Sequence, residues 1–170
     1  SRSSAASDVY KRQVQINLLA VGTRMPAWVD EGYRQYARRM PRECSLVLNE
    51  IPLAQRSKSQ AIERAVNEEG KRMLAALSDR QQVIALDVKG RSWSTEQLAQ
   101  QLDSWKQDGR DISLLVGGPD GLAAGCLQRA EQVWSLSSLT LPHPLVRVLL
   151  AEQLYRAWSL NSGHPYHRAG

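Results

Sequence analysis

The chain has 170 residues, of which 42% are hydrophobic and 23% are charged. This length fits one domain with a core of its own, and the composition excludes fibrous and disordered classes. The longest apolar run, 145–151, is interrupted by Arg147, and a membrane-spanning helix needs roughly 18 apolar residues. We therefore expect a single globular domain.

The first thirteen residues look foreign to this domain. They are polar and aperiodic, they end where an apolar segment begins, and they lack the apolar stretch of a signal peptide. We interpret 1–13 as a non-native or disordered extension and 14–170 as the domain. The whole chain carries a formal charge of +5, and the extension holds three cations and one anion, which leaves +3. That balance is a weak indication of a polyanionic partner.

The two cysteines, Cys44 and Cys126, lie far apart in the sequence and form no Cys-x-x-Cys pair. No histidine lies near them at a spacing typical of zinc ligands, so neither a metal site nor a disulfide framework is expected. We expect two reduced cysteines in or near the core of a cytoplasmic protein.

Strand and helix patterns alternate along the chain. Segments typical of buried strands are 14–21, 46–51, 82–86, 112–116 and 133–136. Segments with helical periodicity run from about residue 23 to 40, then over 62–77, 94–107, 123–132 and about 143–160. Ser94 and Gln97 form a capping box, while Gly70 weakens the prediction of an unbroken second helix. Strands separated by helices predict an α/β fold with a parallel sheet covered on both faces.

Several common nucleotide and hydrolase motifs are absent. The turn after the first strand lacks the G-x-G-x-x-G of dinucleotide sites, and no phosphate-binding P-loop or G-x-S-x-G elbow occurs. The glycines gather instead after the fourth strand, as Gly117-Gly118-Pro119-Asp120-Gly121.

Ligands of α/β sheets bind at the carboxyl ends of the strands, and three such ends are distinctive here. They are 86–87 after the third strand, 117–119 after the fourth, and 137–142 after the fifth. These loops offer backbone donors and acceptors with little side-chain bulk. They predict a pocket for a flat heterocycle such as adenine, held between aliphatic walls.

The C-terminal region gathers the polar candidates. All three histidines, His143, His164 and His167, lie within the last 28 residues. Arg147 and Arg156 are nine residues apart in a predicted helix, so they face opposite sides, one toward the pocket and the other toward solvent or a partner chain. The aromatic residues Trp28 and Trp134 are expected in the core.

Several stretches together resemble one family. They are AVGTRMPAWV near the start, VGGPDGL, WSLSSLTLPHPLVRVLLAEQLYRAW and HPYHR. They are similar to the H family of ribosomal RNA large subunit methyltransferases, small members of the knotted SPOUT class, over essentially all of 14–168. The resemblance implies a homodimer whose C-terminal part forms a deep trefoil knot, an exception to the usual rules of chain threading. It also implies that the cofactor S-adenosylmethionine binds in the knot and that N3 of a pseudouridine in 23S ribosomal RNA is methylated on the assembled ribosome.

The resemblance also assigns site residues. It places cofactor contacts on residues at the three strand ends, namely Leu86, Gly118, Ser137, Ser138, Leu139, Thr140, Leu141 and Pro142. It places catalytic or RNA-facing roles on His143, Arg156, Tyr166 and His167. The hypothesis is that Arg156 stabilises the imide anion of the base, that His143 or His167 accepts its proton, and that Tyr166 stacks on it.

Three other functions stay open at this point. A knotted fold without turnover would be a non-catalytic ribosome- or RNA-binding module. A SPOUT methyltransferase acting on transfer RNA would often need an added RNA-binding domain, for which this chain has no room. Composition and periodicity alone would indicate only a nucleotide-binding α/β protein.

Overall fold

The computed structural model describes residues 13–57 and 61–169, so all but the last residue of the predicted extension 1–13 lies outside the described residues. Five parallel strands form one sheet in the order β2-β1-β4-β3-β5. Their bounds are β1 Val14–Val21, β2 Cys44–Ile51, β3 Gln82–Ser92, β4 Ile112–Val116 and β5 Gln132–Ser135. The predicted parallel α/β fold is therefore confirmed, whereas the knot stays a prediction.

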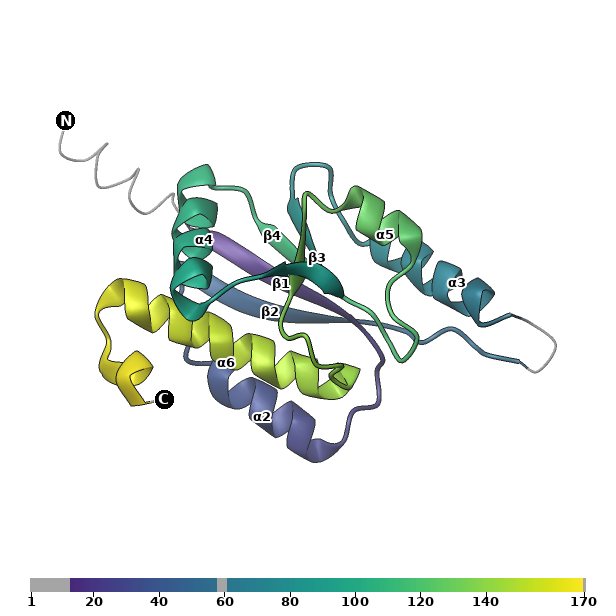
Figure 1. The fold of residues 1–170 in the computed structure, drawn as a ribbon, viewed down its shortest axis with the longest axis horizontal. Helices are drawn as coiled ribbons and strands as arrows, with labels where there is room; N and C mark the ends of the chain where they lie inside the picture. Colours follow the sequence, from purple (N-terminus) through teal and green to yellow (C-terminus); the bar gives the residue numbers. More distant parts are fainter. Residues whose placement is uncertain (1–12, 58–60, 170) are drawn as a thin grey trace.

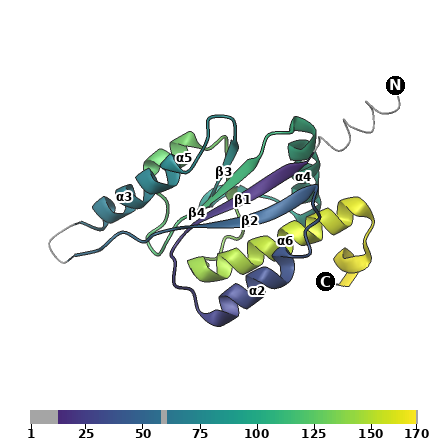
Figure 2. The ribbon, with the colours of Figure 1, turned by 180° about the vertical axis from the view of Figure 1, so that it is seen from behind.

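Helices cover both faces of the sheet (Figures 1 and 2). Their bounds are α2 Ala27–Ala37, α3 Ile62–Ala75, α4 Thr95–Asp108, α5 Ala124–Arg129 and α6 His143–Ser162, followed by the short 3-10 helix η1 Pro165–Ala169. Helices α2, α4 and α6 pack together on one face, while α3 and α5 lie side by side on the other.

The interior strand β1 shows why the sheet needs a layer of helices on each face. Its residues Ile16, Leu18 and Ala20 belong to the core on the side of α2, α4 and α6. Leu19 and Val21 belong to the second core, beneath α3 and α5. Because side chains alternate along a strand, a nearly continuous apolar run buries both of its faces.

The helix boundaries follow local chemistry. The Ser94 side chain accepts from the Gln97 backbone N–H and the Gln97 side chain accepts from the Ser94 N–H, so the predicted capping box is confirmed at the start of α4. Helix α3 continues through Gly70 without a break. A Cβ at that position would lie 2.5 Å from the Cβ of Ala123, so a larger residue would not fit there. The glycine is therefore a point of close approach between α3 and the segment that leads into α5.

Some predictions about burial and length need correction. Trp134 is buried as expected, but Trp28 is 57% exposed near the start of α2, so its placement in the core was wrong. The predicted helix 123–132 is shorter, because Ala130 already has an extended backbone and leads into β5. Two further expectations concern the cysteines and the membrane. Both cysteines are free and buried.

None of the helices in the described part of the chain has the length and apolar character that a membrane span requires.

Candidate active site

A cavity of about 610 Å³ lies where the three predicted strand ends meet. Its walls come from an irregular stretch within β3, from the ends of β4 and β5 with the loops that follow them, and from the first turn of α6. The lining residues are Leu86, Asp87, Val88, Val116, Gly117, Gly118, Pro119, Gly121, Leu122, Leu136, Ser137, Leu139, Thr140, Leu141, Pro142, His143 and Val146. The volume lies within the range of roughly 300–1,000 Å³ that is usual for small-molecule sites.

The structure brings nearly all the predicted cofactor residues to this cavity. Of the eight, Leu86, Gly118, Ser137, Leu139, Thr140, Leu141 and Pro142 line it. Ser138 does not line the cavity and is exposed. Two hydroxyl groups shape this loop, because Ser135 donates to the carbonyl of Ser137 and the Ser137 hydroxyl accepts from the Leu139 N–H, both at 2.9 Å.

The glycine-rich turn after β4 forms another wall. Gly118 and Gly121 pair as an isolated antiparallel bridge, and Gly121 adopts a φ of +83°, which favours glycine. A Cβ on Gly117 would overlap the backbone of Gly121. The chain can therefore fold back on itself here only because Gly117 has no side chain.

The third wall of the cavity is formed by β3, which is longer than the predicted strand 82–86. Strand β3 does not stop at Leu86 but continues to Ser92. Leu86 and Arg91 both pair with Trp134, so the residues between them bow out of the ladder with β5. This irregularity places Leu86, Asp87 and Val88 in the cavity wall, and a bulge is a common means of aiming side chains at a site.

His143, the first residue of α6, also lines the cavity. Burial lowers the pKa of this imidazole below its ordinary value, and the positive charge of Arg147 lowers it further. The neutral form is therefore favoured near pH 7, which suits a group that must accept a proton.

Arg147 lies one helical turn further along α6 and is almost completely buried. Its Nη1 pairs with Glu50 Oε2 at 2.7 Å, and its Nη2 donates to the carbonyl oxygen of Gly22 at 2.7 Å. Arg147 does not line the cavity but ties the start of α6 to the end of β1. The prediction that one of the two arginines of α6 faces the pocket was wrong, because neither Arg147 nor Arg156 lines the cavity.

Arg156 and Tyr166 form a separate cluster at the other end of α6. Arg156 pairs with Glu152 at 2.6 Å, and its guanidinium lies 5.1 Å from the centre of the Tyr166 ring. The Tyr166 hydroxyl donates to Glu152 at 3.2 Å. Thirteen residues separate Arg156 from His143, which is about 20 Å along a helix. Within one chain, Arg156 and Tyr166 therefore lie far from His143. His167 belongs to η1, and its side chain lies outside the described part.

Several cavity residues were absent from the set of predicted cofactor contacts. Val116 ends β4, Leu136 directly follows β5, and Leu122 and Gly121 continue the glycine-rich turn. Extending the predicted segments 117–119 and 137–142 by one residue toward the strand, and the former by three residues beyond Pro119, would have included these four. Val146 lies one turn into α6, and only the packing of that helix places it here.

Comparisons with known proteins agree with this geometry. The family described as Predicted SPOUT methyltransferase matches residues 14–167. Ribosomal RNA large subunit methyltransferase H of Alkalilimnicola ehrlichii is 63% identical over 92% of this chain and all of the relative. The Methylococcus capsulatus protein of the same name is 57% identical over 91% of this chain and all of the relative. A probable methylase family protein from Haemophilus influenzae Rd KW20 shares the fold, with a TM-score of 0.53 at 12% identity, over 91% of this chain and 70% of that one.

The chain is thus a methyltransferase with a parallel α/β sheet, and the cavity beside β3, β4 and β5 is its candidate active site. The chain belongs to the SPOUT methyltransferase family, in the group of the ribosomal RNA large subunit methyltransferase H proteins.

Proposed function

We propose that this methyltransferase uses S-adenosylmethionine to methylate N3 of a pseudouridine in 23S ribosomal RNA, on the assembled ribosome and as a homodimer. The observation that carries the proposal is the cavity at the three strand ends. Seven of the eight residues assigned to the cofactor line it, together with the glycine-rich turn that follows β4. The names of the relatives support ribosomal RNA of the large subunit as the substrate.

The cavity fits this cofactor chemically. Leu86, Val116, Leu136 and Leu141 offer aliphatic walls for an adenine ring, and the loops beside them expose backbone groups that can read its edge. Asp87 places a carboxylate at the same wall, where it can attract the cationic part of the cofactor.

S-adenosylmethionine, when bound, supplies a methyl group attached to a positively charged sulfur. The residues of the chain must align the base with that methyl group and manage the proton on N3 of the base. His143, whose neutral form is favoured, can accept this proton, as can His167. Arg156 stays protonated and can stabilise the negative charge that develops on the base, while Tyr166 offers a ring for stacking.

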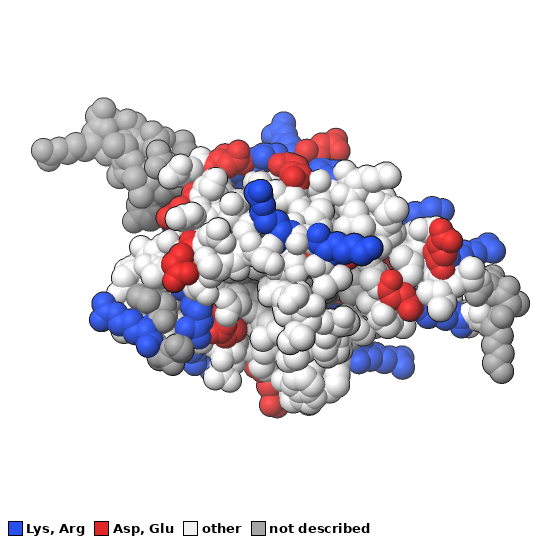
Figure 3. All heavy atoms as spheres, viewed as in Figure 1, with Lys and Arg blue, Asp and Glu red and all other residues white. Residues whose placement is uncertain are grey.

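A second copy of the chain is needed to join these groups. His143 and Arg156 are about 20 Å apart on one helix and cannot act on the same base within one chain. Four apolar residues of α6 are only half-buried, namely Leu145, Val148, Leu149 and Trp158. Figure 3 shows a largely uncharged surface where Figure 1 places α2 and the first half of α6, which suits an interface between copies.

In this proposal the assembled ribosome supplies binding contacts that an isolated RNA stem-loop does not offer. A domain with a net charge of +3 offers few phosphate contacts, and each neutralised phosphate adds only about 0.7–0.9 to the salt dependence of RNA binding. We expect weak, salt-sensitive binding to an isolated RNA stem-loop. Tight and salt-resistant binding to that stem-loop would contradict this part of the proposal.

The first experiment is a calorimetric titration of S-adenosylmethionine into the chain that starts at Val14, followed by methyl transfer to assembled ribosomes. Saturable binding and transfer to N3 of the pseudouridine are the expected results. Absence of binding by folded, dimeric protein would favour the alternative of a non-catalytic ribosome-binding module. Modification of transfer RNA instead of ribosomes would overturn the substrate.

A further inference from the structure

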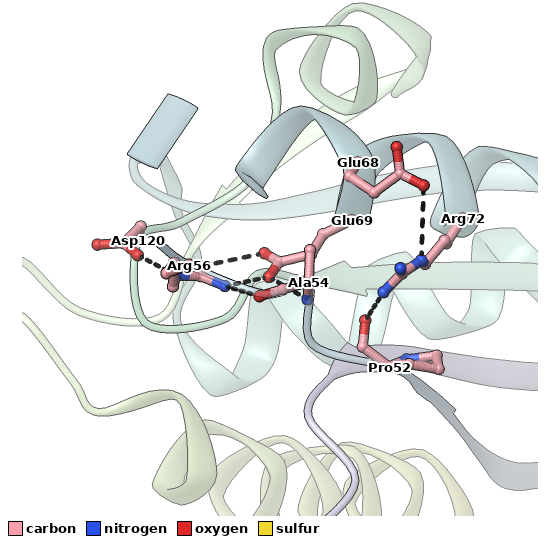
Figure 4. Close-up of polar contacts among 7 residues, drawn as sticks. All are labelled: Pro52, Ala54, Arg56, Glu68, Glu69, Arg72 and Asp120. Atoms are coloured by element: carbon pink, nitrogen blue, oxygen red, sulfur yellow. Dashed lines mark hydrogen bonds and ion pairs between the residues drawn. The ribbon is translucent and has the colours of Figure 1, made fainter. Parts of the chain in front are cut away.

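The connection between β2 and α3 lies against the glycine-rich turn of the cavity, although the two are more than 60 residues apart in the sequence (Figure 4). The contact is built around Glu69 of α3, whose side chain is only 3% exposed. Glu69 accepts from the Ala54 backbone N–H at 3.0 Å and from Arg56 Nη1 at 2.5 Å. The buried carboxylate therefore has its charge and its hydrogen-bonding capacity satisfied by this connection.

Arg56 links three parts of the chain with one guanidinium group. Its Nη1 donates to Glu69 and to the carbonyl oxygen of Ala54, the latter at 2.9 Å. Its Nε donates to Asp120 Oδ2 at 2.9 Å. The planar fork of an arginine can serve such partners at fixed angles, whereas the single ammonium group of a lysine cannot.

Asp120 is the point where this linkage reaches the cofactor cavity. It lies between Pro119 and Gly121, which both line the cavity, and it belongs to the turn closed by the bridge from Gly118 to Gly121. The side chains of Arg56 and Asp120 are 23% and 33% exposed, and such partly exposed ion pairs stabilise a fold only weakly. The pair is thus better suited to orienting the turn than to holding the fold together.

We propose that Arg56, anchored by buried Glu69, is a positioning residue that holds Asp120 and so keeps the Gly118–Gly121 turn in the shape that binds the cofactor. This inference rests on the proposed function, because the cofactor is taken to be S-adenosylmethionine. It predicts that loss of the link weakens cofactor binding and leaves the transfer step itself intact.

Two variants separate this role from stability. Asp120→Ala removes the link to the turn and leaves the pair of Arg56 and Glu69 in place. Arg56→Lys keeps a cation beside Glu69 but cannot reach both carboxylates at once. For each variant we expect the Kd and KM for S-adenosylmethionine to rise about tenfold, while kcat at saturating cofactor stays within about twofold. The melting temperature should change by no more than about 2 °C.

Arg72 provides the matched control. It contacts the same connection through the carbonyl oxygen of Pro52 at 2.9 Å and pairs with Glu68 at 3.8 Å. Figure 4 shows that it lies away from Asp120, on the other side of Glu69. Arg72→Ala should therefore bind the cofactor as the unaltered chain does. A double variant, Arg56→Lys with Asp120→Ala, should lose no more affinity than either single variant, because both remove the same link.

The outcomes are distinct. Unaltered affinity in Asp120→Ala and Arg56→Lys, alongside normal binding by the parent chain, would overturn the positioning role and leave the proposed function standing. An equal loss in Arg72→Ala would also overturn it, because the effect would then belong to the whole connection. No binding by the parent chain would overturn the proposed function together with this inference.

Discussion

Helix α6 begins in the wall of the candidate active-site cavity and ends in the cluster of Arg156, Glu152 and Tyr166, and these two ends differ in what a single chain provides. At the first end, His143 and Val146 meet loops from three strands, and together they enclose about 610 Å³. At the second end, Arg156 and Tyr166 pair with each other and with Glu152, outside that cavity.

In the proposed function, this difference divides the two tasks of a methyltransferase between the two ends of α6. The proposed cofactor end is built by loops that follow neighbouring parallel strands of one chain. The cluster at the other end carries groups suited to an RNA base and its charge, but within one chain it faces no cofactor. We therefore expect variants at the two ends to fail in different ways.

Replacement of Arg156 should have the largest effect. In Arg156→Ala, the rate of methyl transfer to ribosomes should fall by about 10²–10³-fold, because the cation that stabilises the anionic base is lost. The Kd for S-adenosylmethionine should change less than twofold. Single-turnover transfer and calorimetry measure the two quantities. Arg110→Ala is the control, because Arg110 is also held by ion pairs, with Asp108 and Glu131. Near-normal transfer by Arg156→Ala would remove Arg156 from the chemistry.

Replacement of Gly117 should weaken cofactor binding, whereas replacement of Arg156 should slow the transfer step. A Cβ in Gly117→Ala would overlap the backbone of Gly121, so we expect the turn to shift and cofactor affinity to fall by about 30–100-fold. In Gly125→Ala, the matched control, the new Cβ would lie 3.6 Å from Leu74 Cδ1, an ordinary contact, and binding should be unchanged. Calorimetry on both variants tests this. Normal affinity for S-adenosylmethionine in Gly117→Ala would contradict a role of the glycine-rich turn in cofactor binding.

Mixed dimers bring the two ends together in one experiment. Chains carrying Gly117→Ala and chains carrying Arg156→Ala are each expected to be inactive alone. In dimers formed from equal amounts, half of the molecules are mixed, and each mixed dimer has one site with an intact cavity and an intact Arg156 from the other chain. About a quarter of the parent activity should return. No recovery, in samples shown to contain mixed dimers, would place the whole site in one chain.

The smallest effect should be the contribution of His143 to the pH dependence of the free energy of unfolding. Because its pKa is lowered in the folded protein, the unfolded chain binds more protons just below the ordinary value of 6.5. The favourable contribution of neutral His143 is therefore complete above that value, and stability is lost as the pH falls from there toward the lowered pKa. Urea unfolding at several pH values should show this loss in the parent chain and less of it in His143→Gln. Identical profiles would contradict the shift.

The activity profile of the same variant separates the two candidate proton acceptors. Loss of the acidic limb of the transfer rate in His143→Gln would assign the proton to His143. A retained limb would assign it to His167 instead, and His167→Ala is the matching variant.

The sequence alone determined the features that depend on neighbouring residues. The apolar runs of β1 and β4 determined buried strands, and Ser94 with Gln97 determined the start of α4. The three loop segments could be assigned to one site because the carboxyl ends of parallel strands meet at the same edge of a sheet. Local periodicity and this general rule were sufficient for the fold class and for bringing the three loop segments to one cavity. The individual cofactor contacts came from the family resemblance and stay predictions.

Only the tertiary structure decided the features that depend on how distant segments meet. Strand β3 bows out at Leu86 because of its register with β5, and Trp28 is exposed because α2 turns that side away from the sheet. Arg147 is buried because Glu50 and the carbonyl of Gly22 lie opposite it, and Arg56 reaches Asp120 across 64 residues. Such partners follow from strand order and helix packing, which residue periodicity does not encode.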